Sequence, residues 1–128
     1  WHENSGQTFN GSSAENTSLS AVGNGDIVQV AYDLDASKIW FGRNNTWILS
    51  GNPATAAIPT YSNLSGTLAP ACDMMESNSN GTLVFNFGQD SSFAGVKTAA
   101  GNQDDNSIGD FYYDVPAGFM ALCTSNLF

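Results

Sequence analysis

The chain has 128 residues, and 12 acidic against 3 basic side chains give it a formal net charge of −9. This length fits one domain and leaves no room for a second of ordinary size. So few basic side chains cannot build the positive surface that nucleic-acid phosphates or anionic lipids require. No apolar run approaches the roughly 18 residues of a membrane-spanning helix. We therefore expect neither a nucleic acid nor a membrane among the partners of the chain.

Composition also predicts the fold class. Charged residues make up 12% of the chain, which is about half of the roughly 25% in average soluble proteins. The polarity comes instead from Asn, Ser, Thr and Gly, beside 12% aromatic residues. Short strands joined by many turns have this mixture of residues, so we predict an all-β protein.

A β-hairpin is the clearest local signal. The segment GDIVQVAYDLDASKIWFG has β-rich runs at residues 27–34 and 38–42, separated by a short polar stretch. Two such runs around a turn predict a hairpin. Alternation along the first run gives a uniformly apolar face of Val28, Val30, Tyr32 and Leu34, and a mixed face of Ile27, Gln29, Ala31 and Asp33.

Three further strands are expected later in the chain. Residues 66–74 (GTLAPACDM) and 81–89 (GTLVFNFGQ) are typical of a second pair of strands. A last apolar run at residues 119–123 follows a break at Pro116 and predicts one more. The side chains of the second pair that we expect to face the core are Leu83, Phe85 and Phe87.

Two long polar connections, residues 50–66 and 89–109, lie between the expected strands. Loops of this length in a small β domain usually have a function or contribute packing of their own. Aromatic side chains in or beside loops are candidates for ligand contact, and Asn amides can hydrogen-bond the hydroxyl groups of a sugar. The candidate binding residues are Trp47, Tyr61, Asn44 and Asn63.

The sequence lacks the residue sets of common catalytic sites. The single histidine, His2, has no second His or Cys near it to complete a zinc site. No G-x-S-x-G turn occurs, and the three glutamates are scattered rather than paired. We therefore expect no catalytic residues and no enzyme activity.

One loop offers oxygen ligands. Asp104, Asn106 and Asp110 carry hard oxygen atoms of the kind that calcium prefers. In a calcium loop starting at Asp104, however, the fifth position would be the apolar Ile108 and the twelfth would be Val115. The match is partial, and a solvated turn explains the same residues, so we expect no cofactor.

The two cysteines, Cys72 and Cys123, permit one disulfide at most. Both lie in apolar runs without a cationic side chain nearby in sequence, which favours buried free thiols. A disulfide between the two is the alternative, and the redox compartment stays undecided.

Four segments together resemble the SPRY domain: GDIVQVAYDLDASKIWFGRNN, LSGTLAPACDM, TLVFNFGQ and PAGFMALCTSNL. The likeness is closer to SPRY modules of bacteriophage virion proteins, through NFGQDSSFAG, GDFYY and the last of those segments. The resemblance covers most of the chain. It implies a concanavalin A-like sandwich of two antiparallel sheets, with variable end loops that bind and with no catalytic residues.

One departure from the SPRY pattern matters. Such domains normally begin with strands upstream of the segment that WHENSGQTFNG resembles. We therefore expect residues 1–128 to be a single but incomplete SPRY-like domain, with unpaired edges and an uncovered apolar face. Other segments of a longer polypeptide, or further subunits of a homo-oligomeric fibre, would fill the place.

These expectations lead to a noncatalytic structural or binding module of a virion surface or tail-fibre protein. It would lie on the extracellular face of a virion assembled in the host cytoplasm, and its end loops would contact host glycans or neighbouring virion proteins. The alternative is an intracellular SPRY adaptor that binds a short peptide. Arg43 would then anchor an acidic peptide, although the net charge of −9 works against this.

Overall fold

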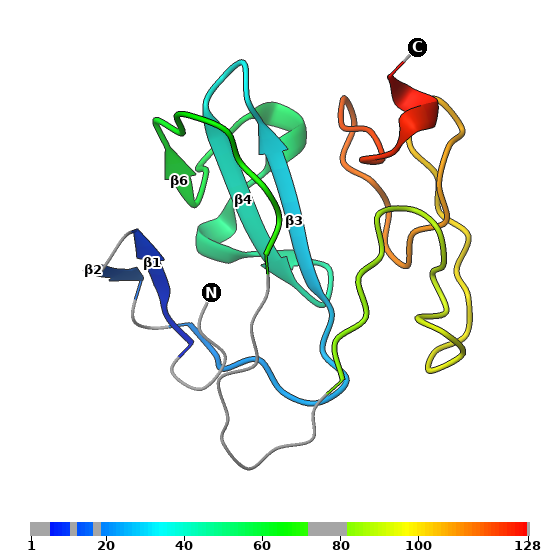
Figure 1. The fold of residues 1–128 in the computed structure, drawn as a ribbon. Helices are drawn as coiled ribbons and strands as arrows, with labels where there is room; N and C mark the ends of the chain where they lie inside the picture. Colours follow the sequence, from blue (N-terminus) through cyan, green and yellow to red (C-terminus); the bar gives the residue numbers. More distant parts are fainter. Residues whose placement is uncertain (1–5, 11–12, 17–18, 72–81, 128) are drawn as a thin grey trace. The chain divides into compact units, whose positions relative to one another are not determined.

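The computed structural model describes residues 6–10, 13–16, 19–71 and 82–127 (Figure 1). The chain divides into two compact units, Trp1–Leu64 and Ser65–Phe128. The regular structure is antiparallel β with short 3₁₀ turns, and the described residues contain no α-helix. Within those residues, no helix has the length and apolar character needed to cross a membrane. The all-β prediction is confirmed at this level.

The first unit contains the predicted hairpin. Strand β3 (Val28–Asp33) pairs antiparallel with β4 (Lys38–Arg43) without interruption of the register. The turn closes through a hydrogen bond from the Ser37 N–H to the Leu34 carbonyl, 3.2 Å long. Local sequence is enough to form this element because two β-rich runs flank a polar turn.

Short strands complete the sheet of the first unit. Strands β5 (Thr46–Trp47) and β6 (Tyr61–Ser62) both pair with β4, so the sheet order is β3-β4-β5 with β6 also on β4. A separate two-stranded sheet is formed by β1 (Thr8–Asn10) and β2 (Ser13–Asn16).

The core of the first unit lies under one face of the four-stranded sheet. Trp40 and Ala31 are cross-strand partners on this face and are 1% and 5% exposed. The Trp40 indole N–H donates to the Ala57 carbonyl at 2.9 Å. Gly51 lets the chain pass close to the ring, because a Cβ there would lie 3.0 Å from Cδ1 of Trp40. The segment of η1 (Ile48–Ser50) and η2 (Pro53–Thr55) thus covers this face.

The opposite face of the hairpin is exposed. Its β3 side chains, Val28, Val30 and Tyr32, are 43%, 53% and 38% exposed, and Leu34 in the turn is 54% exposed. The partition of side chains between the two faces agrees with the prediction. The uniformly apolar face is the open one. The mixed face is covered because residues 48–57 pack against Trp40 and accept its indole N–H.

The second unit differs from the prediction. Its described residues, 65–71 and 82–127, contain no strand, so the strands expected in the described parts of residues 66–74 and 81–89 are wrong. Leu83, Phe85 and Phe87, expected in the core, are 48%, 47% and 38% exposed. At residues 85–89, side chains take the peptide groups: Oε1 of Gln89 accepts the Phe87 N–H at 2.6 Å, and its amide donates to the Phe85 carbonyl at 2.6 Å. Oδ1 of Asn86 accepts the N–H groups of Gly88 and Gln89 at 2.7 and 2.9 Å. A side chain that satisfies backbone donors locally competes with a strand ladder.

The strand expected at residues 119–123 is also wrong. The Ala121 N–H donates to Oδ2 of Asp104 at 2.8 Å, and the Ala121 carbonyl accepts from the Asn126 amide at 2.9 Å. Both polar groups of this buried residue therefore bond to side chains rather than to a neighbouring strand. The chain instead ends in η3 (Thr124–Asn126).

Candidate binding cleft

A cleft of about 330 Å³ lies beside the turn that joins β4 to β5. This volume is at the lower end of the range for small-molecule sites, roughly 300–1,000 Å³. The lining combines two hydroxyls, an amide, a guanidinium and two aliphatic side chains, from Ser20, Thr46, Asn44, Arg43, Leu19 and Ile48. Two stretches of chain therefore form the walls: the segment before β3 and the β4–β5 turn.

The β4–β5 turn is held by side chains as well as by the strands. Asn44 and Asn45 have φ values of 49° and 65°, a region that Asn tolerates better than most residues. Oδ1 of Asn44 accepts the Ile27 N–H at 2.9 Å, and its amide donates to Oδ1 of Asp26 at 2.6 Å. The Asn45 N–H donates to Oε1 of Gln29 at 2.7 Å. The turn is thereby fixed against the start of β3.

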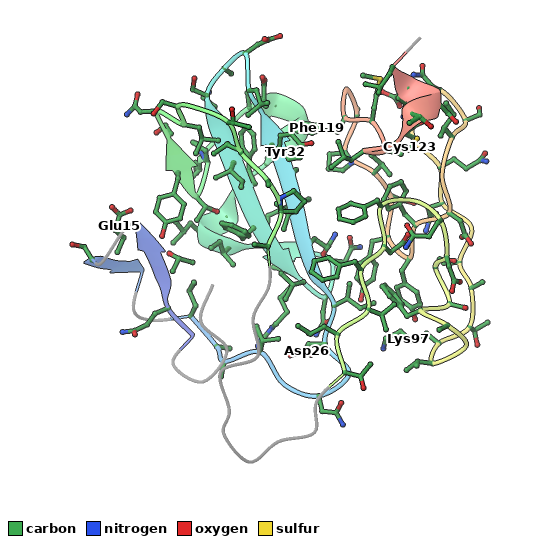
Figure 2. All side chains as sticks on the ribbon, viewed as in Figure 1. Glu15, Asp26, Tyr32, Lys97, Phe119 and Cys123 are labelled. Atoms are coloured by element: carbon green, nitrogen blue, oxygen red, sulfur yellow. The ribbon has the colours of Figure 1, made fainter. Side chains whose placement is uncertain are left out.

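The guanidinium in the cleft is paired internally. Nη1 of Arg43 lies 3.6 Å from Oδ2 of Asp26 and also donates to the Ala21 carbonyl. Asp26 lies on the segment that leads into β3 (Figure 2) and accepts the Gly23 N–H at 2.8 Å. The two side chains are 26% and 23% exposed, so the pair is partly shielded from water. A neighbouring carboxylate therefore offsets the charge of Arg43. The guanidinium already has two partners in the free protein, Asp26 and the Ala21 carbonyl.

The side chains that line the cleft are of types that bind ligands rather than react with them. None of the six lining residues is a carboxylate, a thiol or an imidazole. Ser20 and Thr46 are exposed and present hydroxyls that can donate and accept. Leu19 and Ile48 present aliphatic surface. Such a set can hydrogen-bond a hydroxylated ligand and contact its C–H groups.

Only one of the four sequence-predicted binding residues lines this cleft, namely Asn44. Trp47 is the cross-strand partner of Gly42, and a Cβ at Gly42 would lie 3.0 Å from Cε3 of the Trp47 ring. Tyr61 is the partner of Ile39. Gly42 and Ile39 are three positions apart, and partners in a pair share a face, so Trp47 and Tyr61 lie on opposite faces of the sheet.

Asn63, the fourth predicted residue, also lies outside the cleft lining, and Tyr61 has a packing role. Asn63 is exposed and follows β6 with a φ of 62°. Burial is the main reason why the pKa of Tyr61 is raised, and the charge of Glu15 on β2 adds to it (Figure 2). Tyr61 is therefore a packing residue between β6 and the small β1–β2 sheet.

The carboxylate of Asp104, one of the metal-ligand candidates in the second unit, is occupied by three backbone N–H groups and one side-chain amide. Oδ1 of Asp104 accepts the N–H groups of Asn106 and Ile108, both at 2.9 Å. Its Oδ2 accepts from Ala121 and from the Asn126 amide, both at 2.8 Å. These bonds, led by the one from Ala121, hold the pKa of Asp104 below its ordinary value. The carboxylate thus joins the turn at residues 104–108 to the end of the chain.

The remaining candidates do not join Asp104 in one ligand set. Asn106 uses its amide to donate to Oδ1 of Asn126 at 2.9 Å. A hydrogen bond from the Ser91 hydroxyl is the main cause that lowers the pKa of Asp110. Among the described residues, no group of three or more His, Cys, Asp or Glu side chains is placed to hold a metal ion.

Two residues that organise the structure escaped the sequence reasoning. Asp26 pairs with Arg43 across the hairpin, which only the strand register reveals. Ser91 is fully buried, and its hydroxyl accepts the Ala100 N–H at 2.9 Å. The signal for Ser91 was weak, since serine in a polar stretch is normally a surface residue.

Cys123 carries a free, partly exposed thiol. Cys72 lies outside the described residues, so only the Cys123 part of the free-thiol prediction is described.

No family model matches the chain, and neither does any curated protein or any solved structure. The likeness to SPRY domains therefore stays a prediction from the sequence.

Proposed function

We propose that the chain is a noncatalytic binding module of a virion surface or tail-fibre protein, and that its cleft takes a sugar unit of a host glycan. The observation that carries the proposal is the lining of the cleft, which combines two hydroxyls and an amide with two aliphatic side chains. Sugars present both hydroxyls and C–H faces, and such a lining complements both. The proposal includes neighbouring virion proteins as a second class of partner, which would contact the loops around the cleft.

The charge of the cleft favours an uncharged sugar over an acidic ligand. Arg43 is the only cation among the described lining residues, and Asp26 offsets its charge. The net charge of −9 repels anions at long range. The same arrangement disfavours the anchor that the intracellular adaptor alternative would use, an acidic peptide bound to Arg43.

We further propose a two-sheet sandwich of the concanavalin A-like, SPRY type as the complete fold. The open apolar face of β3, formed by Val28, Val30 and Tyr32, supports this proposal. Contiguous apolar side chains on one side of a sheet normally pack against a second layer, about 10 Å away. In the virion, that layer would come from other segments or other subunits of a fibre.

A glycan array followed by calorimetric titration of the best neutral oligosaccharide tests the function. Thr46→Val removes one lining hydroxyl and keeps a β-branched side chain. Loss of one hydrogen bond of about 1 kcal/mol predicts roughly fivefold weaker binding. Thr67→Val, at an exposed position of the second unit, is the matched control and should bind like the parent. A folded chain that binds no glycan on the array refutes the glycan proposal. Equal effects of Thr46→Val and Thr67→Val on binding would show that the cleft is not the binding site.

A further inference from the structure

We propose that β3 is the edge through which two copies of this chain pair, with each β3 lying antiparallel to its counterpart. This inference does not depend on the ligand of the cleft. Among the described strands, β3 pairs with β4 alone, while β5 and β6 pair with the other edge of β4. Figure 1 shows β6 on that far side of β4. Only the peptide groups that β3 directs away from β4 are available for this pairing.

The hydrogen bonds around the hairpin fix that direction. The Asn44 N–H donates to the Ile27 carbonyl at 3.0 Å, which identifies these two residues as a hydrogen-bonded pair at the end of the ladder. Hydrogen-bonded pairs alternate along an antiparallel ladder. The residues that direct their peptide groups toward β4 are therefore Gln29, Ala31 and Asp33. Those that direct them outward are Val28, Val30 and Tyr32.

The far side of β4 agrees with this alternation. The Thr60 N–H donates to the Ile39 carbonyl at 2.8 Å, on the side away from β3. Ile39 is the partner of Tyr32 in the β3–β4 register. Both members of that pair thus point their peptide groups away from each other, as the alternation requires.

The outward groups of β3 are self-complementary. Val28, Val30 and Tyr32 are evenly spaced about Val30, so a twofold axis at Val30 sets this residue opposite itself. Val28 then lies opposite Tyr32 of the second copy. Each of these pairs exchanges two hydrogen bonds, and a pair of a β-branched and an aromatic side chain is a favourable one. An interface of this kind closes on itself as a dimer.

The edge also lacks the features that normally prevent such pairing. Exposed edges are usually protected by charges, Pro or a bulge. Residues 27–32 (IVQVAY) contain no charge, Pro or Gly, and the β3–β4 register has no bulge. In the twofold register, Asp33 faces Ile27 and Asp26 faces Leu34 of the second copy. No two acidic residues therefore lie directly opposite each other.

The size and charge of the junction set its strength. Val28, Val30 and Tyr32 are 43%, 53% and 38% exposed, and pairing would join the open apolar faces of both copies. One strand edge buries less than the roughly 800 Å² per partner of a stable complex, so the dimer is weak. Each copy carries −9, so salt should strengthen the dimer by screening repulsion. The screening length falls from about 30 Å at 0.01 M to about 10 Å at 0.1 M salt.

Sedimentation equilibrium over a range of protein concentrations, at low and moderate salt, tests the proposal. The dimer fraction should rise with both concentration and salt. Val30→Lys sets two like charges opposite each other across the twofold axis and should abolish the dimer. Val96→Lys is the matched control, because Val96 is 74% exposed in the second unit and the change in net charge is the same. A parent chain that stays monomeric at all conditions, or a Val30→Lys chain that dimerises like the control, overturns the proposal.

Amide hydrogen exchange of the parent chain is a second test of the proposed pairing, and it needs no variant. The amides of Gln29, Ala31 and Asp33 should be protected at every protein concentration. Those of Val28, Val30 and Tyr32 should gain protection only at concentrations where the dimer forms. A uniform response along β3 contradicts the proposed pairing even if the chain dimerises by another surface.

Discussion

The Trp40 side chain offers the sharpest test of how the first unit is held together. We expect Trp40→Phe to lower the free energy of unfolding by about 2 kcal/mol, from two contributions of similar size. The indole N–H bond to the Ala57 carbonyl is 2.9 Å long and is lost. Its net value is about 1 kcal/mol, because the Ala57 carbonyl also accepts the Asn52 N–H and is not left without a donor.

The second contribution is packing. Trp40 is 1% exposed under the η1–η2 segment. Replacing an indole by a phenyl ring removes about 40 Å³, and at about 24 cal/mol per Å³ of residual cavity this costs about 1 kcal/mol. Urea unfolding followed by far-UV circular dichroism measures the sum. With a slope of about 2 kcal/mol per M, the midpoint should fall by about 1 M.

Trp47→Phe is the matched control for this prediction. Trp47 is only partly buried, and its ring lies over the backbone of Gly42 at the short strand β5. The same substitution there should lower the midpoint by less than half as much. Equal shifts for the two variants, or no shift for Trp40→Phe, would refute the assignment of Trp40 as the centre of this core.

Two more variants test other parts of the structure. Gly51→Ala should destabilise the first unit in a urea titration, because a Cβ would lie 2.7 Å from the Ile58 carbonyl oxygen and 3.0 Å from the Trp40 ring. Gly23→Ala is the control and should be neutral, since the atom nearest to its Cβ would be 3.7 Å away. Asp104 has a pKa below its ordinary value in the folded chain, so its stabilising contribution is present above about pH 4 and is lost as the pH falls through the folded-state pKa. Asp104→Asn should therefore be less stable at neutral pH and lose less stability in acid, and parallel acid-unfolding curves would count against this role.

The hairpin was predictable because its information is local. Two β-rich runs and a polar turn specify β3 and β4, and alternation gives the two faces. Which face is covered was not predictable in the same way. That choice depends on the burial of Trp40 under residues 48–58, and therefore on a contact between separate stretches of the chain.

The second unit shows why apolar runs alone mislead. Residues 82–87 and 119–123 have the composition of strands, yet polar side chains nearby supply the hydrogen bonds that a neighbouring strand would give. The Gln89 side chain does this for Phe85 and Phe87, and Asp104 and Asn126 do it for Ala121. Composition does not reveal which partner a peptide group takes.

One residue that lines the cleft is also a candidate from the sequence. Asn44 was singled out because Asn amides suit hydroxylated ligands, and it lines the cleft. Trp47 and Tyr61 were chosen for their positions near loops, but the register sets them on opposite faces. The pairing of Asp26 with Arg43 depends on the β3–β4 hairpin and was not visible in the sequence.

The two walls of the cleft differ in structural role, since one belongs to the β4–β5 strands and turn and the other lies outside the strands. Arg43, Asn44 and Thr46 belong to the strand and turn framework, and Asn44 in particular ties that framework to the start of β3. Leu19 and Ser20 form the other wall and lie outside every strand. Substitutions at these two positions can therefore reshape what the cleft accepts while the scaffold keeps its form. A display library randomised at positions 19 and 20 alone is thus a direct route to new ligand preferences on an unchanged hairpin.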